Sequence, residues 1–484
     1  MGKISFSAHL ARLAEAAPDR PAITVEDRTL TRAQLEERAD TLARHLASLG
    51  VKHDNLVTLA LPNCVEWFVT AVALWKLGAT PQPVSARLPT RELEAIIDLA
   101  DPPIVIGTDA TPSSTRPLFK VIEWLADNPD PAGGEPLPDL VATAWKAPTS
   151  GGSTGRPKLI VSGDPALFDT DAPLGLRLKH DGTMVMPGPL YHNAPVVWTV
   201  QALLAGNHVI QLVKFDETKT LEAIEAHRAD IVYLVPTMMK RILRLPTEQR
   251  ESYDLSSLET VWHLAEPCPA WLKEAWIDWL GAEKIVELYA GTEAQLATVI
   301  TGVEWLAHRG SVGRPLTGLV MICDDDGNEV PVNTMGEVWL KSARETPAYR
   351  YIGAEARQRE GGWESLGDNG WVDDDGYLYL GDRVSDMILT GGANVYPAEV
   401  EAALQEHPSI ESCAVIGLPD DDLGNRVHAI VQADRSTFDE DGVRAFLTER
   451  LVRYKVPRTF ELTDEPLRND AGKVRRSELR AQRL

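Results

Sequence analysis

A run of glycine and hydroxyl residues that ends in a lysine occupies Thr149-Ser150-Gly151-Gly152-Ser153-Thr154-Gly155-Arg156-Pro157-Lys158. Small residues let backbone N–H groups approach an anion, the hydroxyls add donors, and Lys158 supplies a positive charge, a combination that suits a polyphosphate. The spacing is not that of a Walker A loop, and no G-x-G-x-x-G stretch leads from a strand into a helix here. The P-loop NTPase and dinucleotide-binding interpretations therefore lose support.

The composition is that of a globular protein with several domains. The chain has 484 residues, of which 44% are hydrophobic and 25% charged, and at roughly 100–200 residues per domain this length predicts two to four domains. These values exclude wholesale disorder and a fibrous repeat. The formal net charge of −23 argues against nucleic acid or an anionic membrane as the main partner.

Cysteine usage and the amino terminus both indicate a reducing compartment. Cys64, Cys268, Cys323 and Cys413 lie far apart in the sequence, without metal-ligand spacing, so neither a disulfide framework nor a zinc site is expected. The first residues lack the long apolar core of a signal peptide, and no stretch reaches the roughly 18 apolar residues of a membrane span. We predict a cytoplasmic protein without a membrane span.

Helical and strand patterns alternate over the first 310 residues or so. Apolar residues recur at helical spacing in Thr31–Leu49, Cys64–Leu77 and Arg91–Leu99, and Thr31 is a plausible cap. Short β-branched runs lie between and beyond the helices, at Leu56–Leu61, Ile104–Ile106, His208–Leu212, Ile231–Val235 and Lys284–Leu288. The alternation predicts an α/β fold with doubly wound sheets.

The pattern changes after about Gly310. Short strands with turns at Asp326-Gly327-Asn328 and Asp375-Gly376 predict hairpins in a small β-subdomain. From about Asp386 the order becomes strand, helix, strand, strand, helix, which predicts a small α+β domain. The two helices are expected at Pro397–Gln405 and Asp439–Leu451, and the last two strands at Ser412–Gly417 and Val427–Ala433. We place the two domains at residues 1–384 and 385–484.

The carboxyl-terminal end is basic although the whole chain is acidic. From Arg450 onward, ten Lys and Arg residues stand against five Asp and Glu residues. Two interpretations stay open: a solvated basic helix end, or a surface that faces a polyphosphate.

The glycine-rich run resembles the signature of the adenylate-forming superfamily of acyl-CoA synthetases, luciferases and adenylation domains, (S/T)-x-G-(S/T)-T-G-x-P-K. The resemblance covers nearly the whole chain, from Leu61-Pro62-Asn63 to the carboxyl-terminal lysine. The double glycine and Ala265-Glu266-Pro267-Cys268-Pro269 are most similar to bile-acid-type and other bulky-acid CoA ligases. The resemblance implies that the carboxyl-terminal domain is mobile, with Ser385 at the hinge where the family usually has Lys or Asp.

Further motifs of the family imply an ATP site. Tyr289-Ala290-Gly291-Thr292-Glu293 corresponds to Y-(G/A)-x-T-E, in which the tyrosine stacks near adenine and the last two residues serve ATP and Mg²⁺. Asp368 inherits the acceptor for the ribose hydroxyls, and Arg383 a ribose contact. The implied ATP-binding residues are Ser150, Gly151, Gly152, Ser153, Thr154, Gly155, Lys158, Ala265, Glu266, Pro267, Tyr289, Ala290, Gly291, Thr292, Asp368 and Arg383. Thr292 and Glu293 are the implied metal-site residues, because a hard cation prefers oxygen ligands.

Catalysis is implied at Lys473, His192 and Glu293. Lys473 closes Arg468-Asn469-Asp470-Ala471-Gly472-Lys473, which matches the family's lysine loop; its ammonium can reach the acid and the α-phosphate together. His192, in Pro189-Leu190-Tyr191-His192, resembles the residue that gates the acid pocket. Trp198 and Trp262 are expected near that pocket, although large aromatic residues are commonly core residues. Gly391 and Gly392 match the loop that leaves room for the pantetheine arm of coenzyme A.

These motifs predict an ATP-dependent carboxylic acid ligase that forms an acyl-adenylate, releases pyrophosphate and transfers the acyl group to coenzyme A. A stand-alone amide bond synthetase, which transfers the acyl group to an amine, is the alternative, and a luciferase-like outcome shares the same site. A nucleotide-binding regulator is disfavoured because Lys473, Glu293 and the glycine-rich run are intact. The predicted partners are a small carboxylic acid, ATP with Mg²⁺, and coenzyme A or an amine, but not nucleic acid; the oligomeric state stays open.

Overall fold

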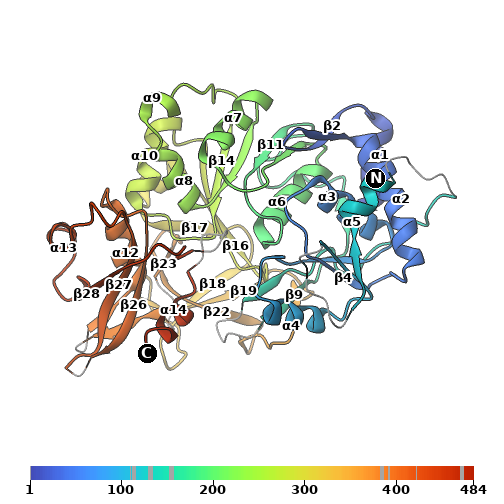
Figure 1. Cartoon of the computed structure of the whole chain (residues 1–484). Helices are drawn as coiled ribbons and strands as arrows, with labels where there is room; N and C mark the ends of the chain where they lie inside the picture. The colour runs from blue at the N-terminus through green and yellow to red at the C-terminus, as the bar shows by residue number, and fades with distance from the viewer. Residues whose placement is uncertain are drawn as a thin grey trace.

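Sheets covered by helices form most of the chain (Figure 1). The computed structural model describes residues 2–108, 111, 116–128, 135–151, 157–381, 386–390, 393–420, 422–468 and 474–484. Within these residues the helices are α1 (Phe6–Ala16), α2 (Arg32–Ser48), α3 (Val65–Lys76), α4 (Thr90–Ala100), α5 (Val121–Asp127), α6 (Asn193–Leu204), α7 (Glu217–His227), α8 (Pro236–Leu243), α9 (Thr247–Arg250), α10 (Ala270–Leu280), α11 (Gly302–Ala307), α12 (Pro397–Glu406), α13 (Glu440–Thr448) and α14 (Arg476–Ala481).

The largest sheet is parallel in one half and antiparallel in the other. Its strand order is β18-β19-β22-β23-β17-β16-β15-β14-β13-β11-β12-β2-β3, with β21 paired to β22. The parallel strands are β2 (Pro21–Val25), β11 (Thr183–Met186), β12 (His208–Gln211), β13 (Ile231–Leu234), β14 (Thr260–Leu264) and β15 (Ile285–Ala290). The antiparallel strands are β3 (Arg28–Thr31), β16 (Ala297–Thr301), β17 (Ser311–Pro315), β18 (Leu319–Cys323), β19 (Gly336–Lys341), β21 (Gln358–Arg359), β22 (Trp363–Val372) and β23 (Leu378–Leu380).

Smaller sheets complete the amino-terminal part. A parallel sheet has the order β5-β4-β6-β7, an antiparallel one has the order β20-β9-β8, and β1 pairs with β10. Their bounds are β1 (Lys3–Ser5), β4 (Leu56–Leu59), β5 (Thr80–Pro83), β6 (Val105–Gly107), β7 (Leu118–Lys120), β8 (Thr149–Gly151), β9 (Pro157–Ser162), β10 (Leu167–Asp169) and β20 (Tyr349–Ile352).

The last sheet belongs to the carboxyl-terminal part and has its own core. Its order is β25-β24-β27-β26, with β28 parallel to β27. The strands are β24 (Ile388–Thr390), β25 (Ala393–Val395), β26 (Ser412–Asp420), β27 (Gly424–Gln432) and β28 (Thr459–Leu462). Val400 and Leu404 of α12 pack with Val427 and Val443 in a cluster separate from the main core. Figure 1 shows this part in orange and red, beside α8 and α10.

Local sequence explains where the principal helices begin and what they bury. Thr31 caps α2 through a complete capping box with Gln34, as its position in the sequence suggests. All twelve residues of α3 are buried, and nine of them are apolar, as expected of a helix enclosed by the core. The parallel strands β13 and β14 are likewise buried throughout, because helices cover both faces of such a sheet.

The α/β, β-subdomain and α+β predictions are confirmed. The expected helices and strands recur within a few residues of their predicted ends, and the turns at Gly327 and Gly376 adopt φ of 82° and 81° between antiparallel strands. In the carboxyl-terminal part, strands β25 and β28 and helix α14 were not predicted. Each is short, so hydrophobic periodicity gives little signal for it. Residues 382–385 lie outside the described residues, and the division at 384/385 stays a prediction.

The structure also bears on the cysteine and membrane predictions. All four cysteines are described and none forms a disulfide. Among the described helices, none is long and apolar enough to cross a bilayer.

A buried ion pair fixes α10 against the end of the parallel sheet. Lys273 Nζ lies 2.5 Å from Glu287 Oε2, and the lysine is fully buried. The same ammonium is 5.0 Å from the ring centroid of Trp305. Since β14 and β15 both end in candidate site motifs, this pair supports the frame on which those motifs stand.

Replacing Lys273 with Met should destabilise the fold strongly, because the Glu287 carboxylate is left buried without its partner. We expect the free energy of unfolding, measured by chemical denaturation, to fall by about 3–5 kcal/mol. The matched control is Lys179→Met, which breaks an exposed ion pair with Glu259 and should lower it by less than about 1 kcal/mol. Similar losses in the two variants would contradict this role of burial.

Candidate active site

The glycine-rich run begins and ends on an antiparallel hairpin. Strand β8 pairs with β9 so that Ser150 faces Lys158 and Gly151 faces Pro157. Strand β20 pairs with the other edge of β9, and Gln82 donates a hydrogen bond to Thr149 Oγ1 at 2.8 Å. The hairpin is therefore anchored on both sides. Its tip, residues 152–156, lies outside the described residues.

Lys158 and Glu293 are brought together by this arrangement, with Tyr351 beside them. Lys158 Nζ lies 3.3 Å from Glu293 Oε1 and 3.9 Å from the ring centroid of Tyr351. The Tyr351 hydroxyl donates a 2.5 Å hydrogen bond to the same carboxylate oxygen. Burial and the nearby carboxylate of Glu293 raise the pKa of Tyr351 far above its usual value, so this phenol stays protonated and continues to donate.

The free side of the Glu293 carboxylate is suited to a cation. The residue is 6% exposed, and within the described part of the chain its Oε2 has no hydrogen-bond donor. Thr292 precedes it and is half-buried. No group of three or more His, Cys, Asp or Glu side chains that could hold a metal occurs in the described residues. A cation here would therefore take part of its oxygen ligands from a bound substrate, as Mg²⁺ does with phosphates.

The predicted adenine and ribose residues contact each other. The Tyr289 hydroxyl, at the end of β15, donates a 2.7 Å hydrogen bond to Asp368 Oδ2 on β22. Ala290 is exposed, and Gly291 follows it. A Cβ at Gly291 would come within 2.5 Å of Leu366 Cδ1, so a side chain here would require Leu366 to move.

The turn Ala265-Glu266-Pro267 follows β14 directly. Ala265 adopts a φ of 75°, in the left-handed region that favours glycine. The Glu266 side chain is buried; its Oε2 accepts a 2.8 Å hydrogen bond from Thr237 and lies 3.4 Å from Arg468 Nη1. The sequence predicted only a backbone contact with the nucleotide at this turn. The structure adds a buried carboxylate whose pKa is raised to about 7, mainly by burial.

His192 occupies the residue before α6. It is half-buried, and its ring centroid lies 4.7 Å from that of Tyr191. The next residue, Asn193, accepts a 2.6 Å hydrogen bond from Lys146 Nζ. Burial lowers the pKa of Lys146 to about 8, although the carboxylates of Asp164 and Glu293 oppose that shift.

Sequence reasoning missed both Lys146 and Tyr351. Lys146 precedes the glycine-rich run in an otherwise uncharged stretch, Ala142–Thr149, and a charge in such a stretch is the signal that could have found it. Tyr351 carries no comparable local signal. It joins the site only because β20 pairs with β9.

Trp198 and Trp262 lie in the main core. Each is 3% exposed, and their rings make an edge contact with centroids 5.7 Å apart. Trp262 also donates a 2.8 Å hydrogen bond to the carbonyl of Leu176. Packing accounts for both residues, and their place in an acid pocket stays a prediction.

Several predicted residues fall outside the described part of the chain. They are Gly152, Ser153, Thr154, Gly155, Arg383, Ser385, Gly391, Gly392 and Lys473. For Ser150 and Gly151, only the backbone pairing described above is available. The roles of all these residues stay predictions.

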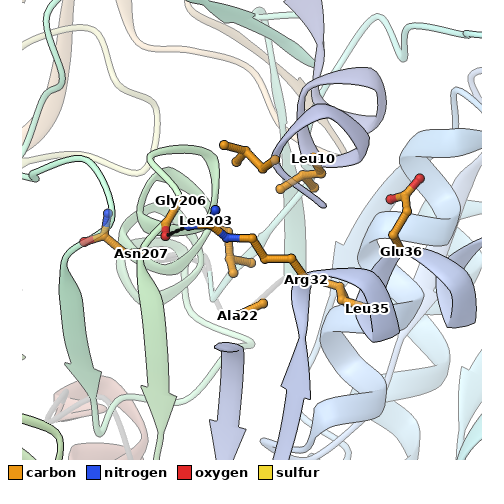
Figure 2. A pocket seen from close by; sticks show the side chains of 9 residues that line it. Leu10, Ala22, Arg32, Leu35, Glu36, Leu203, Gly206 and Asn207 are labelled. Carbon is orange, nitrogen blue, oxygen red and sulfur yellow. Dashed lines mark hydrogen bonds between the residues drawn. The ribbon is translucent and has the colours of Figure 1, made fainter. Parts of the chain in front are cut away.

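A pocket far from these motifs contains none of the predicted residues. Figure 2 shows it between α1, α2 and the end of α6, with Arg32 crossing it. Arg32 donates a 2.5 Å hydrogen bond to the carbonyl of Gly206 and forms an ion pair with Asp181. Because protein groups satisfy its charge, this pocket is not the candidate active site.

Comparison with known proteins identifies the family. A sequence model of the AMP-binding enzymes matches residues 10–350, and one of the AMP-binding enzyme C-terminal domain matches residues 399–473. The chain belongs to the AMP-binding enzyme family.

Individual relatives agree with this family over the full chain. A feruloyl-CoA synthase from an Amycolatopsis species is 32% identical over 480 residues, covering 97% of each chain. The fold matches that of o-succinylbenzoate CoA synthetase from Bacillus subtilis with a TM-score of 0.82 and 23% identity, over 99% of this chain and 98% of the other. An amide bond synthetase from Marinactinospora thermotolerans matches with a TM-score of 0.77 and 25% identity, over 99% of each.

The prediction of the enzyme class is thereby confirmed. The chain is an AMP-forming carboxylic acid ligase of the acyl-CoA synthetase type. The family membership gives a functional context to the hairpin and to the Lys158–Glu293 pair, which lie within the matched range.

Removing the Tyr351 hydroxyl should weaken adenylation, since Glu293 loses a charge-assisted hydrogen bond that orients it. We expect Tyr351→Phe to lower acid-dependent ATP–pyrophosphate exchange by about tenfold or more, the value of one such bond. Tyr379→Phe on β23 is the control, because the Tyr379 hydroxyl donates to Asp373 instead. Equal losses in the two variants would show that the hydroxyl of Tyr351 has no special role.

The raised pKa of Glu266 should appear in the pH dependence of stability. A carboxyl that resists ionisation in the folded state stabilises the fold below the unfolded pKa, about 4.5, and loses this contribution as pH rises through about 7. The free energy of unfolding of Glu266→Gln minus that of the unchanged chain should therefore increase over this window. Chemical denaturation at a series of pH values measures it, with Glu248→Gln on α9 as an exposed control. A difference that does not change with pH would contradict the raised pKa.

Proposed function

We propose that this ligase activates a ring-containing carboxylic acid with ATP and Mg²⁺ and transfers the acyl group to coenzyme A. The observation that carries the proposal is the cluster of Lys158, Glu293 and Tyr351 at the base of the glycine-rich hairpin. It combines a positive charge, a carboxylate with one oxygen available, and an anchored run of small residues, which together suit a metal-bound polyphosphate.

In the first step, a carboxylate oxygen of the acid attacks the α-phosphorus of ATP, and pyrophosphate leaves. Lys158 and the backbone of the glycine-rich run neutralise the polyphosphate, and Lys473 approaches the acid and the α-phosphate together. Thr292 and Glu293 would hold a Mg²⁺ ion, which would neutralise phosphate charge. Tyr289 lies against the adenine, and Asp368 and Arg383 bind the ribose.

In the second step, the thiolate of coenzyme A attacks the acyl carbonyl, and AMP leaves with the bridging oxygen. Gly391 and Gly392 leave room for the pantetheine arm. His192 lies at the mouth of the acid pocket, where an imidazole can polarise the carbonyl or take the thiol proton. We assign these steps to a large domain of residues 1–384 and a mobile domain of residues 385–484, with Ser385 at the hinge.

A ring-containing acid is favoured by two kinds of observation. Some relatives are named for ring acids, feruloyl-CoA synthase and 2-succinylbenzoate–CoA ligase, and another is named for long-chain fatty acids. The sequence also predicts Trp198 and Trp262 near the acid pocket. Similarity to bile-acid-type ligases points to a bulky acid as well. The cytoplasmic location expected from the sequence is part of the same proposal.

An amide bond synthetase is the second candidate. The structural match to the Marinactinospora thermotolerans enzyme supports it. Both candidates share the chemistry of the first step. They differ in the acceptor, an amine in place of a thiol.

The deciding experiment measures pyrophosphate release from ATP and Mg²⁺ across aliphatic, aromatic and steroidal acids, with coenzyme A or a simple amine in parallel. We expect release that depends on a ring-containing acid, with a thioester as product. An amide formed without coenzyme A would favour the second candidate. Release only with aliphatic acids would contradict the proposed substrate class.

A further inference from the structure

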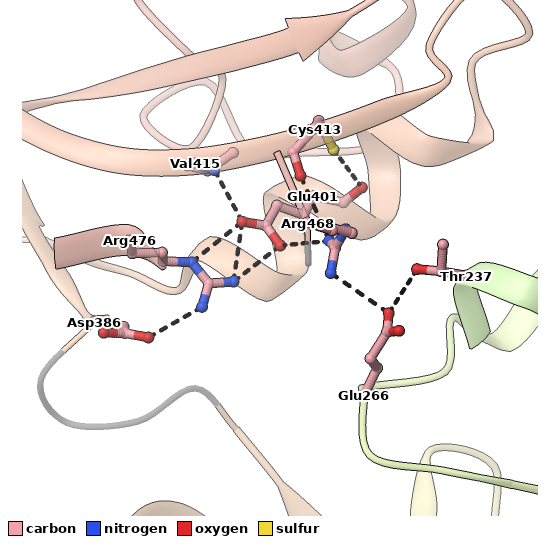
Figure 3. A network of polar contacts seen from close by, with 8 residues as sticks. All are labelled: Thr237, Glu266, Asp386, Glu401, Cys413, Val415, Arg468 and Arg476. Carbon is pink, nitrogen blue, oxygen red and sulfur yellow. Dashed lines mark hydrogen bonds and ion pairs between the residues drawn. The ribbon is translucent and has the colours of Figure 1, made fainter. Parts of the chain in front are cut away.

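The carboxyl-terminal part touches the turn of residues 265–267 through the largely buried side chain of Arg468. Arg468 Nη1 lies 3.4 Å from Glu266 Oε2, and its Nη2 lies 3.4 Å from Glu401 Oε2 on α12. Figure 3 shows Arg468 between the two carboxylates, with Thr237 of α8 donating to Glu266 from the other side. Arg468 thus links a turn that follows β14 with a helix more than 130 residues later.

The same network continues toward the predicted hinge. Glu401 Oε1 accepts from the backbone N–H of Val415 at 2.8 Å, and both Glu401 oxygens contact the guanidinium of Arg476, the closest at 2.9 Å. Arg476 then pairs with Asp386 at 3.0 Å, and Asp386 directly follows Ser385. The order of contacts is Glu266, Arg468, Glu401, Arg476, Asp386, as drawn in Figure 3.

Stability is a poor explanation for the contact at Glu266. The side chains of Glu266 and Arg468 are 7% and 14% exposed. Burial raises the pKa of Glu266 more than the attraction of Arg468 lowers it. A buried ion pair of this kind adds little net stability, and such pairs are retained in some proteins because they select one arrangement.

Some other contacts between the two parts of the chain join a side chain to a backbone carbonyl rather than to a carboxylate. Lys240 of α8 and Arg244, the residue after α8, both donate to the carbonyl of Ile410. Polar groups around Glu266 and Arg468 in the described residues include Thr237, Glu401 and the carbonyl of Cys413. Arg468 differs from them because it immediately precedes residues 469–473, the loop that ends in Lys473. Fixing Arg468 therefore limits where that loop can lie.

We propose that Glu266 and Arg468 are positioning residues that hold the carboxyl-terminal part against the turn of residues 265–267 during the first step and separate for the second. The inference rests on the two-step function proposed above. Through Glu401 and Arg476, the same contact is linked to Asp386, the residue after the predicted hinge residue Ser385.

The test separates the two half-reactions in Glu266→Gln, Arg468→Gln and the double variant. Acid-dependent ATP–pyrophosphate exchange reports the first step, and thioester formation from preformed acyl-adenylate and coenzyme A reports the second. We expect each single variant to lower the first rate by about tenfold while leaving the second within about twofold, a split that general loss of folding would not produce. The double variant should be little worse than either single one, because the residues act through one contact.

The matched control is Glu92→Gln. Glu92 on α4 pairs with Arg475, another contact between the two parts of the chain, but one that solvent screens. We expect both half-reactions to stay within about twofold of the unchanged chain. Equal loss of both steps in the Glu266 and Arg468 variants, or no loss of the first, would overturn the proposal.

A second measurement needs no turnover. Hydrogen exchange at the amides of 410–415 should accelerate in Glu266→Gln, which leaves the contacts of Arg468 with Glu401 and Cys413 in place, relative to Glu92→Gln; unchanged exchange would overturn the proposal. If the unchanged chain shows no pyrophosphate exchange with any acid, the proposed function fails, whereas exchange that the Glu266 and Arg468 variants leave intact refutes only the positioning role.

Discussion

The contact of Lys158 with Glu293 is the constraint on which the candidate site depends. These residues come from β9 and from the loop after β15, and Tyr351 of β20 donates to the same carboxylate. Three distant segments therefore meet at one carboxylate oxygen, which fixes the glycine-rich hairpin relative to the end of the large sheet. Because Oε1 is occupied by these protein groups, Oε2 is the oxygen that the proposed function assigns to the cation.

Buried charges recur around this centre and serve different ends. Lys273 and Glu287 hold α10 beneath the strands that carry the site motifs, and both charges are balanced within the frame. Lys146 donates to the amide oxygen of Asn193, the residue after His192, and burial lowers its pKa although the carboxylates of Asp164 and Glu293 oppose that shift. Glu266 is buried against Arg468 at the join between the two parts of the chain. The first arrangement stabilises the frame, while the third is better explained by the orientation that it selects.

Much of the fold and of the site was predictable from the sequence. The capping box of Thr31 and Gln34 and the turns at Gly327 and Gly376 are local, so residue type and spacing reveal them. The motif residues Lys158, Tyr289, Glu293 and Asp368 were found because each lies in a recognisable run. Tyr351, Arg468 as a partner of Glu266, and Lys146 as a partner of Asn193 could not be found that way. Their contacts depend on strand pairing and packing between segments far apart in the chain, where no spacing rule applies.

Oxygen-18 tracing tests the central claim most directly, because the claim is that the acid's own oxygen attacks the α-phosphorus. An accepted acid labelled in both carboxylate oxygens is turned over with ATP and coenzyme A, and the AMP is analysed by mass spectrometry. The account predicts AMP that carries one labelled oxygen per turnover, since thiol attack at the carbonyl leaves the bridging oxygen with the phosphate. Unlabelled AMP from a turnover that still yields thioester would contradict it.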